Sequence, residues 1–426
     1  MKLARWFPGM AAAIVLVIGL ACAPEQVDPV GDDDDEPLSF TVVALPDTQV
    51  YADEYPEMFD AQTAWIAEQA AALNIAFVTH LGDVVDNGPS DRQWANADAS
   101  LTILDQAGVR YGVAMGNHDN MYSDFEYQYG ADVDHSCSAV SNDIDCDAVH
   151  YKKWGGPVRI DDHDWYGAAS PSGQSHYEAF QFGEYEFLFL HLAVDPRAEE
   201  RGWGEQVLDD HPTALVHLTT HRYLYDFRIV DIMPDPLPLL TGGRNNALIH
   251  GLLGQDLYYI DSIPAEDLFT ELIATHPNIY MVQCGHVDSE YRQQTDNDAG
   301  LPVFEIMTDF QSFHPQGGDG WLKTLTYDLD AGTLQVRTYS PTLDEYRANG
   351  DGLDVSLEIL GTALDSLGSY LESMGLDTEE LAELLEYWTT TEEGRQEYLE
   401  AAYGDGQRDS EFLLDVDFAA YATASD

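Results

Sequence analysis

The sequence predicts an α/β fold that contains two β-sheets. Apolar, β-branched strands alternate with helical segments from residue 40 to about residue 114, and this alternation indicates a parallel sheet covered by helices. Three strands follow one another closely at Val303–Met307, Leu322–Tyr327 and Leu334–Tyr339. Their short separations predict antiparallel pairing in a second sheet.

The first half of the chain carries ordinary boundary signals. Pro46 ends the first strand, and Ser90 is the expected N-cap of the second helix. The expected elements in order are a strand over Phe40–Leu45, a helix over Glu57–Leu73, a strand over Ile75–Val78, a helix from Ser90 to about Ala107 and a strand over Tyr111–Ala114.

The second half is less regular. From Asn120 to about Gly173 the chain is polar and rich in Asp, Tyr and Gly, which predicts a long loop insertion. Beyond it we expect strands at Tyr185–His191, Ala214–Thr219 and Ile279–Val282, with a helix from about Pro264 to Ala274 before the last of them.

The C-terminal part differs from the rest. We expect the main domain to cover residues 39–347 and a helical insertion to cover residues 348–405. In that insertion, leucines recur at three- and four-residue steps, and Asp377 with Glu380 forms a capping box. Residues 406–426 are expected to hold a final edge strand near Phe412–Leu414 and a tail.

The N-terminus predicts export. Residues 1–22 have a short basic start and an apolar run too short to span a membrane comfortably, followed by Gly19-Leu20-Ala21-Cys22. This resembles a bacterial lipoprotein signal in which Cys22 is lipidated, although a simple secretory signal is the alternative. Residues 23–38 predict a disordered acidic linker. We therefore expect a lipoprotein on the cell envelope or a secreted protein.

The charge is strongly negative, with 77 Asp+Glu against 18 Lys+Arg and a formal net charge of −59. Such a surface repels nucleic acids and anionic membranes, so we expect no nucleic-acid-binding face and membrane association only through an N-terminal lipid. A phosphate substrate would need local positive charge here, and bound cations are the obvious source. The sequence predicts no oligomeric state.

Four cysteines are present. Cys137 and Cys146 lie close together in a polar stretch, so a local disulfide is expected between them in an exported protein, with a zinc-binding pair as the weaker alternative. Lipidation would consume Cys22, which leaves Cys284 as a lone buried thiol.

Metal-capable residues follow the predicted strands. They are Asp47 with Gln49, Asp83, Asn117 with His118, His221, and His286 with Asp288. Histidines within or beside apolar strands, such as His80, His191 and His217, are expected to be core residues instead.

In order, these residues read D-x-Q, G-D-x-x-D, G-N-H-D, a lone H and G-H-x-D. This series resembles the calcineurin-like metallophosphoesterase superfamily, whose pattern is D-x-H, G-D-x-x-D, G-N-H-D/E, H and G-H-x-H. The stretch from Asp309 to Leu322 also looks like exported members of that group. The resemblance implies an αββα sandwich, in which two mixed β-sheets are flanked by helices, here with a C-terminal helical insertion.

The resemblance also implies an exported phosphoester hydrolase with two divalent metal ions bridged by Asp83. Asp47, Gln49 and Asp288 would hold the first ion, and Asn117, His221 and His286 the second. A bridging hydroxide would attack phosphorus, and His118 would bind or protonate the ester. The substrate would be a small-molecule or surface phosphoester, and the ions Mn, Fe, Zn, Ca or Mg.

Two positions depart from the superfamily pattern. Gln49 and Asp288 stand where histidines are usual, and both fall on the first ion. All-oxygen ligation would favour Mn²⁺, Fe, Mg²⁺ or Ca²⁺ over Zn²⁺. Gln49 could instead be a loop cap. Arg222 and Arg292 could hold phosphate, with a structural salt bridge as the equal alternative.

Two rival functions stay open from the sequence. One is a non-catalytic cell-surface protein that binds phosphate or another ligand on the same scaffold, because the altered first ion site could have lost turnover. The other is a phosphodiesterase rather than a monoesterase.

Overall fold

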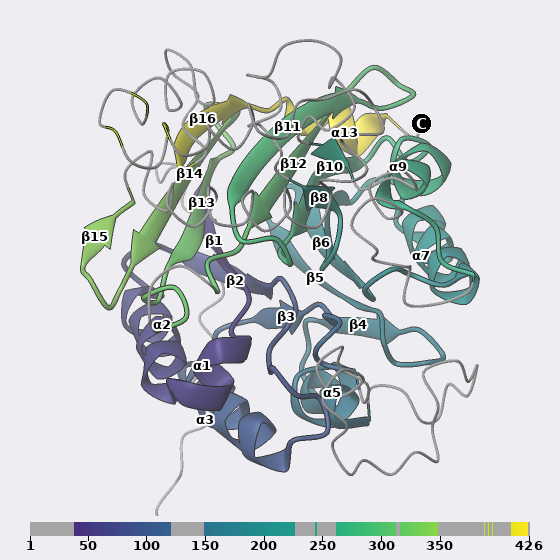
Figure 1. Ribbon diagram of the computed structural model, residues 1–426. Helices are drawn as coiled ribbons and strands as arrows, with labels where there is room; N and C mark the ends of the chain where they lie inside the picture. Colours follow the sequence, from purple (N-terminus) through teal and green to yellow (C-terminus); the bar gives the residue numbers. More distant parts are fainter. Residues whose placement is uncertain are drawn as a thin grey trace, which may run out of the picture.

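Two large mixed β-sheets face each other, and helices cover their outer faces (Figure 1). This computed structural model describes residues 38–120, 149–225, 243–244, 261–311, 316–347 and 410–424, together with positions 387, 391 and 394. The predicted α/β sandwich of two mixed sheets flanked by helices is confirmed.

The first sheet has seven strands in the order β15-β14-β13-β1-β2-β3, with β16 also paired to β14. The β1, β2 and β3 strands are mutually parallel, whereas β13 lies antiparallel to β1. The strands are β1 (Ser39–Leu45), β2 (Ile75–His80), β3 (Tyr111–Val113), β13 (Leu322–Asp328), β14 (Thr333–Ser340), β15 (Glu345–Tyr346) and β16 (Glu411–Asp415).

The second sheet also has seven strands, in the order β11-β12-β10-β7-β6-β5-β4. Its central strands β6, β7, β10 and β12 are parallel, and antiparallel strands close both edges. The strands are β4 (Tyr166–Ala169), β5 (His176–Phe182), β6 (Tyr185–Leu192), β7 (Leu215–Thr220), β10 (Ile279–Cys284), β11 (Glu290–Asp296) and β12 (Pro302–Thr308); β8 (Leu224–Tyr225) and β9 (Gly243–Arg244) form a separate small ribbon.

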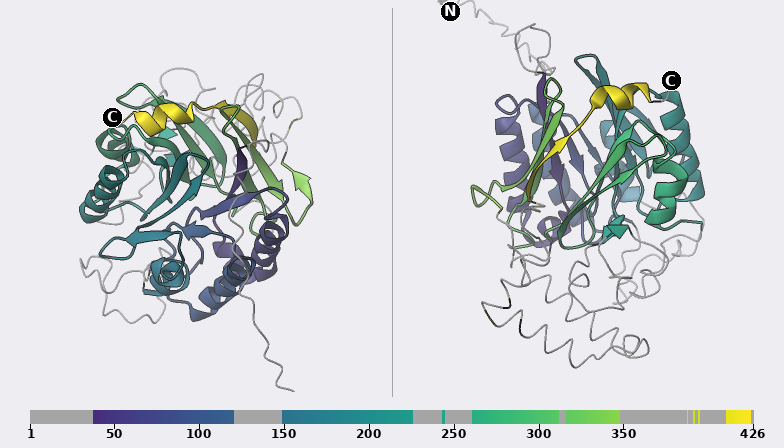
Figure 2. Two further views of the ribbon diagram at one scale, coloured as in Figure 1. Left: turned by 180° about the vertical axis from the view of Figure 1, so that it is seen from behind. Right: turned by 90° about the horizontal axis from the view of Figure 1, so that it is seen from above.

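Three apolar layers hold the sandwich together. Aromatic side chains fill the space between the sheets, where Phe77 stacks on Phe189 with ring centroids 3.9 Å apart. Figure 2 (right) shows helices on both outer sides of the sheets. The helices are α1 (Gln49–Glu54), α2 (Pro56–Gln69), α3 (Asp91–Ala107), α5 (Val149–Trp154), α6 (Pro157–Ile160), α7 (Ala198–Asp210), α9 (Ala265–Leu268), which continues as the π-helical segment η2 (Phe269–Ile273), and α13 (Phe418–Thr423).

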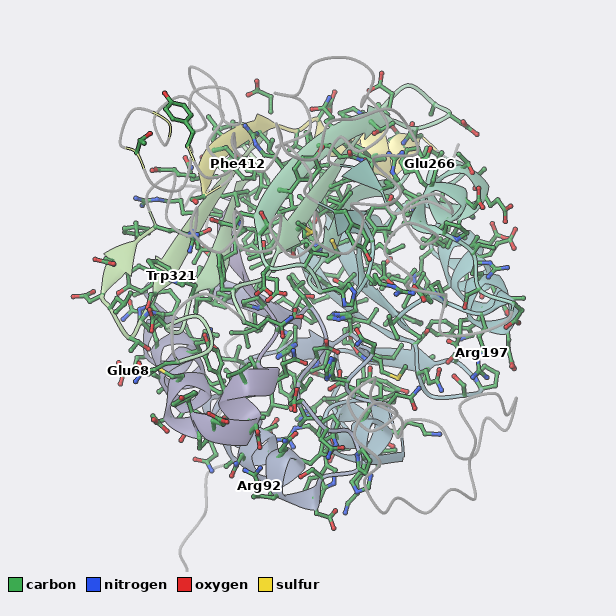
Figure 3. The ribbon with its side chains drawn as sticks, in the orientation of Figure 1. Glu68, Arg92, Arg197, Glu266, Trp321 and Phe412 are labelled. Carbon is green, nitrogen blue, oxygen red and sulfur yellow. The ribbon has the colours of Figure 1, made fainter. Side chains whose placement is uncertain are left out.

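Most helices and strands predicted for the first part of the chain are present in the structure. The Ser90 side chain accepts a hydrogen bond from the Gln93 backbone N–H, so it is the N-cap of α3 as predicted. Acidic side chains such as Glu68 on α2 and Glu266 on α9 are exposed on the outer helices (Figure 3), where water solvates the large negative charge.

The predicted antiparallel pairing of the three late strands is confirmed for β13 with β14 and is wrong for β12. The β12 strand pairs in parallel with β10 in the second sheet, whereas β13 and β14 pair antiparallel in the first sheet beside β1. Short connections between strands indicate turns, but they do not indicate which sheet each strand belongs to. The hairpin partner of β12 is β11, a polar strand that the sequence analysis missed.

The predicted long loop from Asn120 to Gly173 is also wrong in its described part. It contains α5, α6 and β4, which are short and separated by Gly155, Gly156 and a brief turn, so their periodicity is hard to recognise. The β5 strand and the α7 helix were not predicted either. The α7 sequence holds two glycines and few apolar residues, which hides its helical pattern.

Several predictions fall outside the described residues. These are the export signal with Cys22, the acidic linker up to residue 37, the Cys137–Cys146 disulfide and almost all of the insertion over residues 348–405. The predicted domain boundaries therefore stay predictions. Cys284 is a free, buried thiol. Among the described helices, none combines the length and apolar character needed to cross a membrane.

Glu290, at the start of β11, joins the two sheets. Its carboxylate accepts hydrogen bonds from Lys323 Nζ on β13 at 2.6 Å and from Ser410 Oγ at 2.6 Å, and it pairs with Arg347 Nε at 2.9 Å. Lys323 is fully buried and Glu290 is 7% exposed. Burial alone would raise the pKa of Glu290, but Lys323 and Arg347 outweigh it and lower this pKa to about 2.

This depressed pKa predicts a pH-dependent stability. The Glu290 carboxylate should contribute about 3 kcal/mol to the free energy of unfolding above its ordinary pKa, and this contribution should be lost as pH falls from about 4.5 to about 2. In urea unfolding, the free energy of unfolding of wild type should therefore exceed that of Glu290→Gln at pH 6, and this difference should shrink towards pH 2.

The matched control is Glu345→Gln, because Glu345 is exposed on β15. It should leave the free energy of unfolding unchanged at both pH values. If the free energies of unfolding of wild type and Glu290→Gln differed by the same amount from pH 6 to pH 2, the account would be contradicted.

Candidate metal centre

The predicted site residues gather where parallel strands of both sheets end. Parallel strands direct their carboxyl ends to one edge of a sheet, which is where α/β proteins collect ligand-binding side chains. In this structure Asp47 and Gln49 follow β1, Asp83 follows β2, Asn117 and His118 follow β3, His221 follows β7, and His286 and Asp288 follow β10.

His221 lies at the centre of this group. Its Nε2 atom is 3.0 Å from Asp83 Oδ2, 3.1 Å from Asn117 Oδ1 and 3.9 Å from Asp47 Oδ2. Both His221 and Asp83 are at most 1% exposed. Residues from β1, β2, β3 and β7 therefore meet at one buried nitrogen atom.

The tautomer of His221 indicates what this site binds. Its Nδ1 lies 2.9 Å from the Leu81 carbonyl oxygen, which can only accept, so Nδ1 carries the proton. In the neutral ring, Nε2 then presents a lone pair to the oxygens of Asp83, Asn117 and Asp47. Acceptors that converge in this way are satisfied by a cation, and a hydrogen-bonded Nδ1 is typical of metal-binding histidines.

Asp83, His221 and His286 can bind one metal ion together. Each offers a ligand atom, and these three atoms lie within 4.8 Å of one another. The imidazole rings of His221 and His286 are 5.1 Å apart, edge to face. Burial, followed by the proximity of His221 and Arg222, lowers the pKa of His286, so this ring is neutral and able to bind a metal.

Asp47 lies among other acids. The His286 backbone N–H donates to Asp47 Oδ2 at 3.1 Å. Burial raises the pKa of Asp47 well above its usual value, and repulsion from Asp309, Asp83 and Asp288 raises it further. A bound cation would offset this repulsion, so the donor set fits the divalent metals that the sequence predicts.

Two site residues have strained backbones. Asp83 has a φ of 47° and His286 a φ of 74°, in the left-handed region that most residues avoid. Such conformations are stabilised by the surrounding structure and occur often at functional sites.

Glycines give the ligands room. A Cβ atom on Gly116 would lie 2.1 Å from Asp83 Oδ1, and one on Gly285 would lie 2.1 Å from Asp47 Oδ1. Only glycine allows these backbones so close to the carboxylates. The G-N and G-H pairs of the sequence pattern thus have a steric reason.

His118 lies at the outer side of the group. Its backbone N–H donates to Asp83 Oδ1 at 2.8 Å, and its Nδ1 donates to the Asp86 carbonyl oxygen at 2.8 Å. The side chain is 20% exposed. Burial lowers the pKa of His118, but Asp83 and Asp86 outweigh burial and raise it to about 10, so the ring holds a proton at neutral pH.

A calcineurin-like phosphoesterase family model matches residues 40–298, which include every one of these strand ends. The chain belongs to the calcineurin-like phosphoesterase family. The predicted recognition of this family is confirmed. The family uses divalent metal ions, and the Asp83, His221 and His286 cluster is a candidate for holding one of them.

Several known proteins are similar to this phosphoesterase-family chain. The uncharacterized protein YvnB of Bacillus subtilis (strain 168) is 30% identical over 334 residues, which cover 75% of this chain and 22% of that protein. The chain thus spans about a fifth of this relative's length.

Solved structures give weaker likenesses. A purple acid phosphatase from yellow lupin (Lupinus luteus) seeds matches with a TM-score of 0.43 and 13% identity, over 73% of this chain and 54% of that chain. A dimetal phosphatase from Danio rerio matches with a TM-score of 0.37 and 14% identity, over 72% and 97%. At these TM-scores the likenesses carry no functional weight.

The sequence analysis noted the stretch that begins at Asp309 but did not assign Asp309 to the site. This residue directly follows β12, is fully buried, and raises the pKa of Asp47 more than any other single charge does. Burial and repulsion from Asp288 raise the pKa of Asp309 in turn. Its position at a parallel strand end was the available signal, but the family match ends at residue 298.

The two arginines predicted as candidate phosphate-binding residues have different surroundings. Arg222 pairs with Asp195 through both Nε and Nη2 and is buried, so its guanidinium is engaged in a structural salt bridge. Arg292 stacks over Phe412 at 4.2 Å and lines a cavity of about 210 Å³, to which none of the predicted metal-binding residues contributes.

The three histidines predicted as core residues are fully buried or nearly so. Burial lowers the pKa of His80, of His191 and of His217, which keeps these rings neutral. His80 Nε2 lies 3.0 Å from Thr48 Oγ1, beneath the loop that carries Asp47.

The close approach of Gly116 to Asp83 predicts a steric phenotype. Gly116→Ala should displace the Asp83 carboxylate and weaken Mn²⁺ binding by about 10–100-fold, the range found when a group that supports a ligand is changed. Thermal unfolding with and without Mn²⁺ measures the effect, because a bound metal raises the melting temperature.

Gly202→Ala on α7 is the control, since a Cβ atom there meets nothing within 4 Å. It should keep the full Mn²⁺-dependent shift. A Gly116→Ala protein with the wild-type shift would contradict the proposed role of this glycine.

Proposed function

We propose that the protein is an exported, dinuclear metal-dependent phosphoester hydrolase. The family supports phosphoester chemistry, and the N-terminal sequence supports export, with Cys22 as the proposed lipidation site. Gln49 and Asp288 are proposed as further ligands of the first ion, beside Asp47 and Asp83.

The single observation that carries this proposal is the convergence on Asp83. Its Oδ2 contacts His221, its Oδ1 accepts from the His118 backbone, and Asp47 Oδ2 lies 3.9 Å from the same His221 nitrogen. A carboxylate with two oxygens turned to different partners is suited to holding two cations at once. Divalent cations, when bound, would bring positive charge to the phosphate oxygens and make a water molecule more acidic.

His118 would supply the acid. Because its Nδ1 donates to the Asp86 carbonyl, the Nε2 atom is the one available to a substrate, and the ring is partly exposed beside the buried acids. A proton held at Nε2 can pass to the leaving oxygen of an ester. The Asp86 carbonyl thus orients the ring for this transfer.

The strongly acidic surface narrows the substrate class. A net charge of −59 disfavours long polyanions, so we propose a small-molecule or surface phosphoester. The positive charge needed for its recognition would come from the bound cations, since Arg222 is paired with Asp195.

Hydrolysis of p-nitrophenyl phosphate and bis-p-nitrophenyl phosphate tests the proposal. Asp83→Asn should abolish both hydrolysis and binding of two Mn²⁺ ions, because it weakens the shared ligand. His118→Ala should lower kcat by about 10²–10⁴-fold while both ions stay bound. The ratio of the two substrates shows whether monoesters or diesters are preferred.

His150→Ala is the matched control. His150 is 22% exposed and pairs with Asp91, as His118 pairs with Asp86, but it lies on α5. It should leave kcat unchanged. Tight phosphate binding by a two-ion wild type without any turnover would support a binding protein and contradict the proposed hydrolase.

A further inference from the structure

A chain of two amides leads from Asp309 to Gln49. The Gln311 backbone N–H donates to Asp309 Oδ1 at 2.9 Å, and its side-chain Nε2 donates to Asp309 Oδ2 at 3.1 Å. The Oε1 atom of Gln311 then accepts a hydrogen bond from Gln49 Nε2. One residue at a strand end of the second sheet is thereby linked to the helix that follows the first strand.

The chemistry of these groups sets the direction of the chain. Gln311 uses its backbone N–H and its side-chain NH₂ group as donors to Asp309, which leaves its side-chain oxygen to accept from Gln49. Gln49 must in turn donate through Nε2, which leaves its Oε1 atom at the other end. Asp309 therefore determines which end of the Gln49 amide faces the site.

The remaining oxygen is buried without a partner. Gln49 is only 6% exposed, and its Oε1 atom has no hydrogen-bond partner in the structure. An unpaired buried amide oxygen costs about 1–3 kcal/mol, so its presence calls for an explanation. A cation that accepts this oxygen as a ligand supplies one.

The surroundings supply further oxygens. Asp47 stands two residues before Gln49, and Asp309 lies beside Asp288 because its backbone N–H donates to the Ser289 carbonyl at 3.0 Å. Asp47 and Asp309 are at most 2% exposed. Several buried carboxylates that lie near one another favour the binding of a divalent cation.

We propose that Asp309 and Gln311 complete the first cation site. Asp309 adds carboxylate charge to that site and, through Gln311, holds the Gln49 amide so that its oxygen faces the cation. Gln311 is a positioning residue, because it acts through Gln49. This inference rests on the proposed two-cation function.

The proposal accounts for both departures from the superfamily pattern at once. With Gln49 and Asp288 in place of histidines, the first ion would have carboxylate and amide oxygens only. Such a set selects Mn²⁺, Mg²⁺ or Ca²⁺ over Zn²⁺, whereas imidazole suits Zn²⁺. The second ion keeps His221 and His286, so the two sites would differ in selectivity.

A purely structural role makes a different prediction. If the amide chain only ties the loop after β12 to α1, breaking it would lower stability equally with and without metal. Metal affinity and selectivity would then stay the same.

Metal titration of the apoprotein distinguishes a role in the first cation site from a purely structural role of the amide chain. Full-length protein stripped by chelation is titrated with Mn²⁺, and separately with Zn²⁺, by isothermal calorimetry. The variants are Gln311→Met, Asp309→Asn and Gln49→His, the last of which installs the residue usual in the superfamily. Gln62→Met is the control, because Gln62 is fully buried on α2 and its Oε1 is also unpaired, but its Nε2 donates to the Trp321 carbonyl instead.

Wild type should bind two Mn²⁺ ions. Gln311→Met and Asp309→Asn should weaken one of the two sites by about 10–100-fold and leave the other unchanged. Gln49→His should raise the affinity for Zn²⁺ relative to Mn²⁺ at the same site, which keeps the proposal testable if the other variants fail to fold. Gln62→Met should leave both sites at wild-type affinity.

Two results would overturn the inference in distinguishable ways. Unchanged Mn²⁺ affinities in Gln311→Met and Asp309→Asn, with an unchanged metal preference in Gln49→His, would overturn it while the two-ion hydrolase stands. A wild type that binds fewer than two Mn²⁺ ions would overturn the proposed function and this inference together.

Discussion

Buried polar side chains crowd around Asp83, and the site depends on how they are paired. The Nε2 atom of His221 lies within 4 Å of oxygens of Asp83, Asn117 and Asp47 in a place that water hardly reaches. Buried acceptors without donors are costly, and the cost is removed when cations bind among them. The sandwich brings the acceptors together because parallel strands from both sheets end at the same place.

The surrounding structure stabilises this arrangement at several levels. Gly116 and Gly285 leave room for the carboxylates, and the positive φ angles of Asp83 and His286 are held by the elements on either side. Farther out, Glu290 ties β11 to β13 through Lys323 only two residues beyond Asp288. Strain and charge at the site are therefore balanced by packing and by paired charges in the layers around it.

The early strands were predicted correctly from the sequence, and most of the candidate site residues could be named from it, because both depend on local signals. Asp83 comes shortly after a strand that begins with four apolar residues, and a carboxylate near such a strand end is visible without any structure. Glycine before Asp83, Asn117 and His286 added a second local signal. These positions could be read without knowing how the sheets pair.

The features that the sequence did not predict are those set by pairing between distant parts of the chain. Nothing local shows that β12 joins β10 while β13 joins β1, because strand spacing does not encode sheet membership. Asp309 was missed for the same reason, since its role follows from the sheet that β12 enters. The link from Gln311 to Gln49 spans 262 positions and depends on side-chain geometry alone.

The most direct test of the central claim is X-ray diffraction from crystals grown with Mn²⁺, measured at the manganese absorption edge. The account predicts two anomalous peaks roughly 3.5–4 Å apart, both bound by the Asp83 carboxylate. A single peak, or two peaks that do not share Asp83 as a ligand, would contradict it.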